Sequence, residues 1–459
     1  MSLLGPKVAV ANAVGALARR AGRGGGTSLP GKVLMRAEPH AIGLLASRLE
    51  HGNVVVSATN GKTTTAAMIA SILERDGRRL VHNRAGANMA GGVAAALAAA
   101  SRRGGRSLDG DLGLFEVDEF WLGPVVGELR PRALLLANLF RDQLDRYGEL
   151  ETIGERWAEA VAGLPPATAL VLNADDPLIA DLGRARDALF FGVDDDSLAR
   201  PEMQHAADSK HCRRCGHPYA YSAVYLGHLG HYACPNCGQR RPDPAVRATE
   251  VALHGIRSSV FTLVTPEGET PVRLPLPGLY NVYNALAAAA LCHALGVSLV
   301  EIVAGLEGVA PAFGRAETLR LRGRDASLLL IKNPAGANEV LRTLTLEGAS
   351  LDVLGVLNDN VADGRDVSWV WDADWELIAP HLSRMVCAGT RAAELAVRLK
   401  YAGADPAKLT VVEDLELALD QALAMSSPPT PLYVLPTYTA LLGLRELLAR
   451  RGEAQEYWR

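Results

Sequence analysis

A glycine turn followed by a lysine and three threonines lies within residues 53–66, whose sequence is NVVVSATNGKTTTA. The three valines predict a buried parallel strand, and the apolar residues after the turn predict a helix. Backbone N–H groups at a helix start bind anions, the Lys62 amine can reach β- and γ-phosphates, and the Thr63 hydroxyl can ligate Mg²⁺. An ordinary strand-to-helix turn is the alternative, because Val56 stands where the usual phosphate-binding motif has its first glycine. The residues expected to bind ATP here are Thr59, Asn60, Gly61, Lys62, Thr63 and Thr64.

Four of the six cysteines form two C-x-x-C-G motifs, at residues 212–216 and 234–238. Two such knuckles predict a tetrahedral zinc ribbon, and metal binding is favoured over disulfides in a reducing compartment. Because sulfur fills all four positions, the zinc is expected to be structural. The predicted ligands are Cys212, Cys215, Cys234 and Cys237. The nearby histidines are interpreted as surface residues and not as ligands: His211, His217, His228 and His231.

The overall charge and hydropathy exclude some classes of protein. A net charge of -4 over 459 residues gives no basic field, so nucleic acid is not expected as a partner. Arginines and tyrosines near the knuckles could form a nucleic-acid face, but a ribbon that interrupts an ATP-binding domain is expected to stabilise it or to dock a partner. No apolar stretch reaches the roughly 20 residues that span a bilayer, and the order of charges at the N-terminus is wrong for a secretory signal. We therefore expect a cytoplasmic protein.

Polar side chains follow predicted strands at residues 54–56, 112–115, 133–137 and 169–172. In an open, doubly wound sheet, ligands bind beyond the carboxyl ends of the strands. Glu116 directly follows one of these strands, so we expect it to join Thr63 as a Mg²⁺ ligand. A solvated surface carboxylate is the alternative. The pattern predicts an α/β fold with a central P-loop ATPase domain.

A second α/β unit follows in the sequence, with strands predicted at residues 328–331, 351–357, 385–388, 409–412 and 431–435. It is expected to be a Rossmann-like domain that closes over the ATP site and excludes water. Asn281 and Asn284, one helical turn apart, are expected to hold the adenine or a phosphate, with helix capping as the alternative. The predicted organisation is a helical segment at 1–50, an ATP-binding domain at 51–315 with the ribbon inserted at about 205–245, and a C-terminal domain at 316–459.

Three stretches resemble the Mur ligases, the ATP-dependent carboxylate-amine ligases of peptidoglycan synthesis: residues 58–64 (ATNGKTT), 278–288 (GLYNVYNALAA) and 313–317 (FGRAE). The resemblance implies that Arg315 approaches the γ-phosphate. Residues 138–148 also resemble a Mur segment, but Gln143 replaces a histidine associated with the second metal site. Trp157 stands where the resemblance places a carbamylated lysine. A second cation is therefore not expected to be organised as in the amino-acid-adding members.

Residues 332–338 (KNPAGAN) and 358–369 (NDNVADGRDVSW) resemble the MurT family, the synthetase subunits of lipid II isoglutaminyl synthase. The resemblance implies that ATP phosphorylates the α-carboxylate of D-glutamate in the lipid II stem peptide, and that ammonia converts the acyl phosphate to D-isoglutamine. It implies a heterodimer with a GatD-type glutaminase. Asp366 would complete the Cys-His pair of this partner. Lys62 is expected to act in phosphoryl transfer. Lipid II as substrate implies peripheral contact with the inner face of the plasma membrane.

Two other functions remain open from the sequence. A Mur-type amino-acid ligase or a folylpolyglutamate ligase is the main alternative, although Gln143 and Trp157 disfavour it. A zinc-ribbon scaffold that binds ATP without ligase chemistry is the other. The remaining thiols, Cys292 and Cys387, lie in an apolar helix and an apolar strand and are predicted to be buried. Nitrogen is therefore expected to come from a partner.

Overall fold

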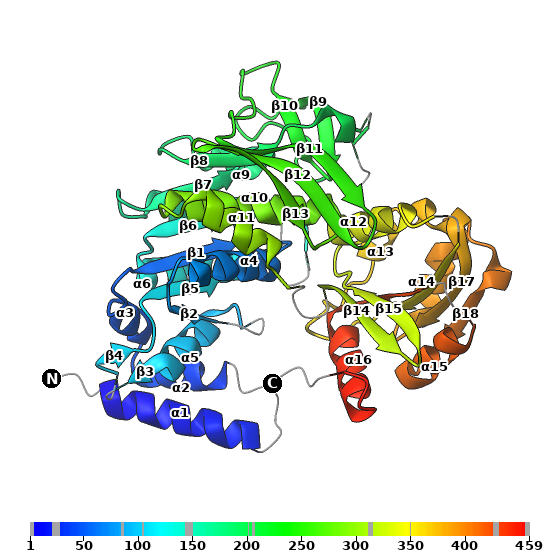
Figure 1. Ribbon diagram of the computed structural model, residues 1–459, viewed down its shortest axis with the longest axis horizontal. Coiled ribbons are helices and arrows are strands. Elements are labelled where there is room, and N and C mark those ends of the chain that lie inside the picture. Colours follow the sequence, from blue (N-terminus) through cyan, green and yellow to red (C-terminus); the bar gives the residue numbers. More distant parts are fainter. Residues whose placement is uncertain are drawn as a thin grey trace.

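The structure, a computed structural model, describes residues 4–20, 28–83, 87–102, 105–142, 150–200, 202–203, 207–310, 315–348, 350–425 and 431–454. Two sheet domains lie side by side, and an N-terminal helical layer lies along the bottom of the first domain in the view of Figure 1. This layer contains α1 (Leu4–Arg20), α2 (Leu29–Ala37) and α3 (Ala41–Ala46). In the described part of the chain, every helix is too short or too polar to cross a membrane.

The first domain contains a nine-stranded mixed sheet in the order β13-β12-β11-β8-β7-β6-β1-β5-β2. The strands from β2 to β11 in this order run parallel, and β12 and β13 add an antiparallel edge. Their bounds are β1 (Asn53–Ser57), β2 (Leu80–His82), β5 (Leu112–Glu116), β6 (Ala133–Leu136), β7 (Ala169–Asn173), β8 (Leu189–Val193), β11 (Val246–His254), β12 (Ser258–Thr265) and β13 (Gly268–Leu274).

Helices cover both faces of this sheet, which explains why its central strands are apolar throughout. Successive β1 residues point to opposite faces, so Val54 and Val56 join one hydrophobic core while Val55 joins the other. The first core also takes α4 (Lys62–Arg75), α10 (Leu279–Ala294) and α11 (Leu299–Glu307). The second takes α5 (Ala90–Ala100), α6 (Leu122–Leu129), α8 (Leu150–Ala162) and the N-terminal helices.

The predicted parallel strands are present within one or two residues of their expected bounds, but the antiparallel extension was not predicted. Residues of β12 alternate between partly exposed and buried positions, which is the pattern of a strand with one covered face. Two short hairpins and a helix complete the domain: β3 (Ser101–Arg102) with β4 (Ser107–Leu108), β9 (Ala220–Leu226) with β10 (Leu229–Ala233), and α9 (Pro177–Asp181).

The second domain contains a six-stranded sheet in the order β14-β15-β19-β16-β17-β18, parallel except for β14. β14 begins at Arg315, where the sequence predicts the domain boundary. The strands are β14 (Arg315–Leu321), β15 (Arg324–Leu329), β16 (Leu351–Val356), β17 (Leu382–Ala388), β18 (Leu409–Val412) and β19 (Leu432–Pro436). The helices are α12 (Pro334–Thr345), α13 (Trp369–Asp372), α14 (Ala392–Tyr401), α15 (Leu415–Met425) and α16 (Tyr438–Arg450).

The strand order locates the ligand crevice of the first domain. From β1 the chain moves to β2 and β5 on one side, whereas from β6 it moves to β7 and β8 on the other. The carboxyl ends of the neighbouring strands β1 and β6 therefore flank a switch point, where ligands of such sheets bind. The predicted phosphate-binding turn follows β1 at this point.

Candidate active site and metal-binding cluster

The turn between β1 and α4 contains a left-handed glycine immediately before the helix. Gly61 adopts a φ of 86°, and a Cβ atom there would lie 2.0 Å from Oδ1 of Asn284. Glycine is therefore required both by conformation and by close approach. Helix α4 begins at Lys62, so its unpaired N–H groups and its dipole favour an anion beside the turn.

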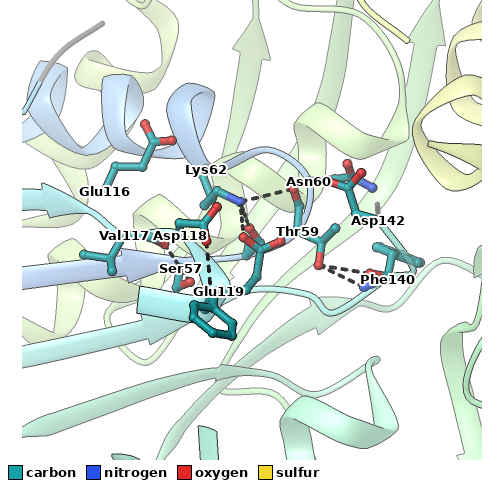
Figure 2. Close-up of polar contacts among 12 residues, drawn as sticks. Ser57, Thr59, Asn60, Lys62, Glu116, Val117, Asp118, Glu119, Phe140 and Asp142 are labelled. Carbon is teal, nitrogen blue, oxygen red and sulfur yellow. Dashed lines mark hydrogen bonds and ion pairs between the residues drawn. The ribbon is translucent and has the colours of Figure 1, made fainter. Parts of the chain in front are cut away.

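Lys62 is buried and its amine has several oxygen partners (Figure 2). It donates to Oε2 of Glu119 at 2.8 Å and to the backbone carbonyls of Ala58 and Thr59. Burial acts to lower the pKa of Lys62, but the carboxylates of Glu119 and Asp118 outweigh it and raise this pKa. The lysine is thus held as an ammonium ion and can neutralise phosphate charge.

Three buried carboxylates lie at the end of β5 and just after it, at Glu116, Asp118 and Glu119. Burial opposes ionisation of Glu119, but the ammonium groups of Lys62 and Lys332 outweigh it and lower its pKa. Burial raises the pKa of Asp118, and the neighbouring Glu119 charge raises it further. The Lys62–Glu119 pair was not predicted; Glu119 stands in the polar stretch after β5, but sequence spacing gave no reason to select it.

The Thr63 hydroxyl donates to Oε1 of Glu116 at 3.1 Å, so the two expected Mg²⁺ ligands are neighbours. Figure 2 shows the Glu116 side chain on the α4 side of the turn. Mg²⁺ prefers oxygen ligands and is commonly held by one or two protein groups together with phosphate oxygens and waters. Thr63 and Glu116 therefore fit a magnesium site.

The predicted nucleotide-binding residues differ in what their side chains contact. Asn281 and Asn284 form a buried amide chain in which Asn284 accepts from the Thr65 hydroxyl and donates to Asn281. They line the cavity beside the turn and support it from α10. The Thr59 hydroxyl instead contacts the main chain of Phe140. The same cavity is also lined by Asn60, Gly61, Thr63 and Thr64. The Arg315 side chain lies outside the described residues.

Both domains line one cavity of about 380 Å³, which contains the turn and the three carboxylates. Asn60 and Asn333 exchange side-chain hydrogen bonds of 2.9 and 3.3 Å between the domains. Lys332, also from the second domain, forms an ion pair with Asp142. The phosphate-binding turn is therefore in direct contact with the second domain, a relationship that required the tertiary structure.

Asp366 lies after β16 in the second domain and is exposed. Its Oδ1 accepts a 2.8 Å hydrogen bond from the Ser368 backbone, and hydrogen bonds from Ser368 lower its pKa. The nearby Asp363 differs because it is buried and accepts from the backbone and hydroxyl of Thr439. A small pocket beside Asp366 shares Asp142, Lys332 and Asp363 with the main cavity.

The four knuckle cysteines converge, with all their sulfur atoms within 4.8 Å of one another. A tetrahedral zinc site at roughly 2.3 Å per bond separates its sulfurs by roughly 3.8 Å, so the cluster fits such an ion. Gly216 and Gly238 have φ values of 75° and 74°, which allows the same turn in both knuckles. The cluster can therefore hold a metal with four sulfur ligands.

The surroundings of the knuckles correct one interpretation of the sequence. His211 and His217 are exposed as expected, but His228 is fully buried, with Nε2 3.3 Å from Oδ2 of Asp176. His231 is half-buried and contacts Asp194. The surface interpretation was wrong for these two because the strands β9 and β10 pack onto the central sheet. The disfavoured alternative, an aromatic face for nucleic acid, loses two of its tyrosines, since Tyr219 and Tyr225 are buried.

Comparison with known proteins identifies the family. Residues 56–238 match the family model of the Mur ligase middle domain, and residues 330–441 match that of the MurT ligase C-terminal domain. The lipid II isoglutaminyl synthase (glutamine-hydrolysing) subunit MurT of Streptococcus pneumoniae is 34% identical over 430 residues, covering 93% of each chain. This chain belongs to the MurT family. The MurT subunit of Staphylococcus aureus strain N315 is 31% identical over 442 residues, covering 95% of this chain and 97% of that protein.

The Mur ligase fold of this MurT family member is also evident from solved structures. A pseudomurein peptide ligase type C from Methanothermus fervidus superposes with a TM-score of 0.68 at 23% sequence identity. The match covers 89% of this chain and 80% of the other. The predicted fold class, an α/β Mur ligase fold followed by a second sheet domain, is confirmed.

One departure of this MurT family member from the other Mur ligases has a structural role. Trp157 is almost fully buried, and its indole N–H donates to the backbone carbonyl of Glu119 at 2.9 Å. Trp157 stands where the resemblance places a carbamylated lysine. It therefore holds the backbone of Glu119, the residue whose carboxylate pairs with Lys62. Gln143, the other departure, lies outside the described residues.

Proposed function

We propose that this chain is the synthetase subunit of a lipid II isoglutaminyl synthase that uses ATP and Mg²⁺. It would amidate the α-carboxylate of D-glutamate in the stem peptide, at the inner face of the membrane that carries lipid II. The observation that carries the proposal is the position of Lys62, Thr63 and Glu116 in a cavity shared with the MurT-type second domain. The near full-length relationship to MurT subunits supports the same reaction.

The chemistry follows from the low reactivity of a carboxylate toward amines. A carboxylate oxygen of the substrate attacks the γ-phosphorus of ATP, and ADP leaves. Ammonia then attacks the acyl carbon, loses a proton, and displaces phosphate to leave the amide. Lys62 supplies positive charge where it develops on the transferring phosphoryl group, and the α4 N-terminus binds phosphate oxygens. Bound Mg²⁺ would further neutralise phosphate charge, with Thr63 and Glu116 as its protein ligands.

The nitrogen source proposed is a separate glutaminase of the GatD type. Outside the knuckles the chain has only Cys292 and Cys387, both buried, and burial raises the pKa of each thiol. Neither is suited to form the thiolate that attacks glutamine. The exposed Asp366 can instead orient a histidine of the partner and stabilise its imidazolium form.

Reconstitution with lipid II, ATP, Mg²⁺, glutamine and a GatD-type partner tests the function. Mass spectrometry of the released stem peptides is expected to show replacement of one carboxyl hydroxyl by an amino group. Leaving out either the partner or glutamine is expected to prevent this change unless ammonium is supplied. Addition of a free amino acid to the stem peptide or to a folate, with no amidation, would contradict the proposal and support the alternative ligases.

We also propose that the knuckle cluster holds a structural zinc ion. The purified protein is expected to contain about one zinc per chain, because four thiolates complete a tetrahedral site. Replacing Cys212 by serine is expected to reduce the zinc content strongly and to lower the thermal unfolding midpoint, since metal binding contributes to folding. Metal analysis and calorimetry measure both effects. Cys387→Ala, far from the knuckles in β17, is the control for zinc content, and equal metal loss in this variant would contradict the assignment.

A further inference from the structure

Strands β9 and β10 form the ribbon hairpin. The turn of this hairpin lies against the ATP cavity, and the cysteine knuckles lie at its other end. Strands β9 and β10 are joined by Gly227 and His228, and Leu226 pairs with Leu229 across this turn. Both leucines are nearly fully buried and line the cavity. They belong to the hydrophobic core that also contains β1 and α4. The ribbon is therefore a structural part of the cavity wall.

His228 connects this turn to the phosphate-binding turn. Its ring centroid lies 4.7 Å from that of Phe140, and its Nε2 lies 3.3 Å from Oδ2 of Asp176. The same Asp176 oxygen accepts a 3.0 Å hydrogen bond from the Leu139 backbone. Phe140 in turn donates its backbone N–H to the Thr59 hydroxyl at 3.0 Å. The hairpin thus packs on Phe140, whose backbone holds the hydroxyl of Thr59 in the phosphate-binding turn.

The hairpin also lies close to the second domain. Arg200 donates its backbone N–H to the carbonyl of Val224 in β9, at 2.9 Å. Its guanidinium forms a 3.3 Å ion pair with Glu339 of α12. Ala335 and Val340, from the same helix, line the cavity. The apolar part of the cavity therefore has walls from the hairpin, from α12, from Leu276 in the segment before α10, and from Tyr280 in the first turn of α10.

The distribution of polar and apolar groups indicates what each part of the cavity binds. The phosphate-binding turn, Lys62 and the carboxylates provide the charged part, suited to phosphates and Mg²⁺. Leucine side chains cannot bind phosphate, but they provide a favourable surface for the flat, uncharged base of a nucleotide.

We propose that the ribbon hairpin is a nucleotide-binding element, in which Leu226 and Leu229 form the wall that packs against the purine base. This inference rests on the proposed function, because it assumes that the triphosphate occupies the turn at Lys62. His228 acts as a positioning residue that holds Phe140 and, through it, Thr59. The ribbon then contributes to nucleotide affinity in addition to the stability of its domain.

Titration of the full-length protein with a fluorescent ATP analogue tests this proposal. Leu229→Ala is expected to weaken binding by about tenfold, because it removes apolar contacts with the base. Leu229→Met, which keeps the volume, is expected to bind nearly as the unchanged protein does. Val224→Ala is the matched control, since Val224 is an equally buried aliphatic residue of the same hairpin that does not line the cavity.

Zinc content and thermal midpoint, measured for every variant, establish that the ribbon remains folded. If Leu229→Ala and Val224→Ala weaken nucleotide binding equally, the effect is general destabilisation and the proposal is wrong. If Leu229→Ala changes only the KM for lipid II, the wall binds the acceptor substrate and the proposal is also wrong. Failure of the unchanged protein to bind the analogue would contradict the proposed function itself, so the two failures are distinguishable.

Discussion

Replacing Lys62 by alanine is expected to lower the rate of ATP-dependent amidation by about 10²–10³-fold or more. The reason is the loss of the buried ammonium ion that neutralises charge on the transferring phosphoryl group. Single-turnover amidation, with ATP hydrolysis measured in parallel, provides the rate. Lys400→Ala, which removes an exposed lysine at the end of α14, is the control for a general loss of positive charge. Unchanged turnover in Lys62→Ala would contradict the enzyme assignment and favour a scaffold that only binds ATP.

The same substitution has a separate effect on stability. Lys62 is paired with the buried Glu119, so its removal leaves a buried carboxylate without its hydrogen-bonded cation, at a cost of about 3–5 kcal/mol for a broken buried ion pair. A second substitution, Glu119→Gln, removes that charge and is expected to restore much of the unfolding free energy. It is not expected to restore the amidation rate, because the phosphoryl group still lacks its lysine. Denaturant unfolding and single-turnover rates of the double variant therefore separate folding from chemistry.

Asp366→Asn is expected to reduce glutamine-dependent amidation by up to about 10⁴-fold, the effect of removing the carboxylate that orients a catalytic histidine. Amidation supplied directly with ammonium is expected to remain unchanged, because Asp366 is exposed and does not line the ATP cavity. Stability is expected to change by less than about 0.5 kcal/mol, as for other surface positions. The comparison requires the complex with its glutaminase and two assays that differ only in the nitrogen source.

Asp372→Asn is the matched control for this prediction. Asp372 is also exposed, at 51% of its side chain, and lies in the same stretch of the second domain. Its replacement is expected to leave both assays unchanged. If Asp366→Asn lowers the ammonium-dependent rate as strongly as the glutamine-dependent rate, then Asp366 acts on the synthetase reaction and its proposed role in the partner's triad is wrong.

The candidate site was predictable to different extents along the chain. The turn at residues 58–64 could be recognised because all its phosphate-binding groups are contiguous, and the spacing of the cysteines similarly indicated a four-sulfur cluster. The carboxylate that pairs with Lys62 could not be selected, because three acids lie at the end of β5 and just after it, and their order in the chain does not reveal which one reaches the amine. Burial of His228 was also missed, since its partners Phe140 and Asp176 come from segments far away in the sequence.

Local sequence patterns were sufficient to predict the local units of this protein: buried parallel strands, a glycine turn before α4, and two cysteine knuckles, each encoded within a dozen residues. Which of these units meet was visible only in the folded molecule. Folding brought Lys332 and Asn333 of the second domain to the phosphate-binding turn, and it placed the turn of the ribbon hairpin in the wall of the same cavity. The physical reason is that local patterns record which face of an element is buried, whereas the partner that buries it is set by packing between segments far apart in the chain.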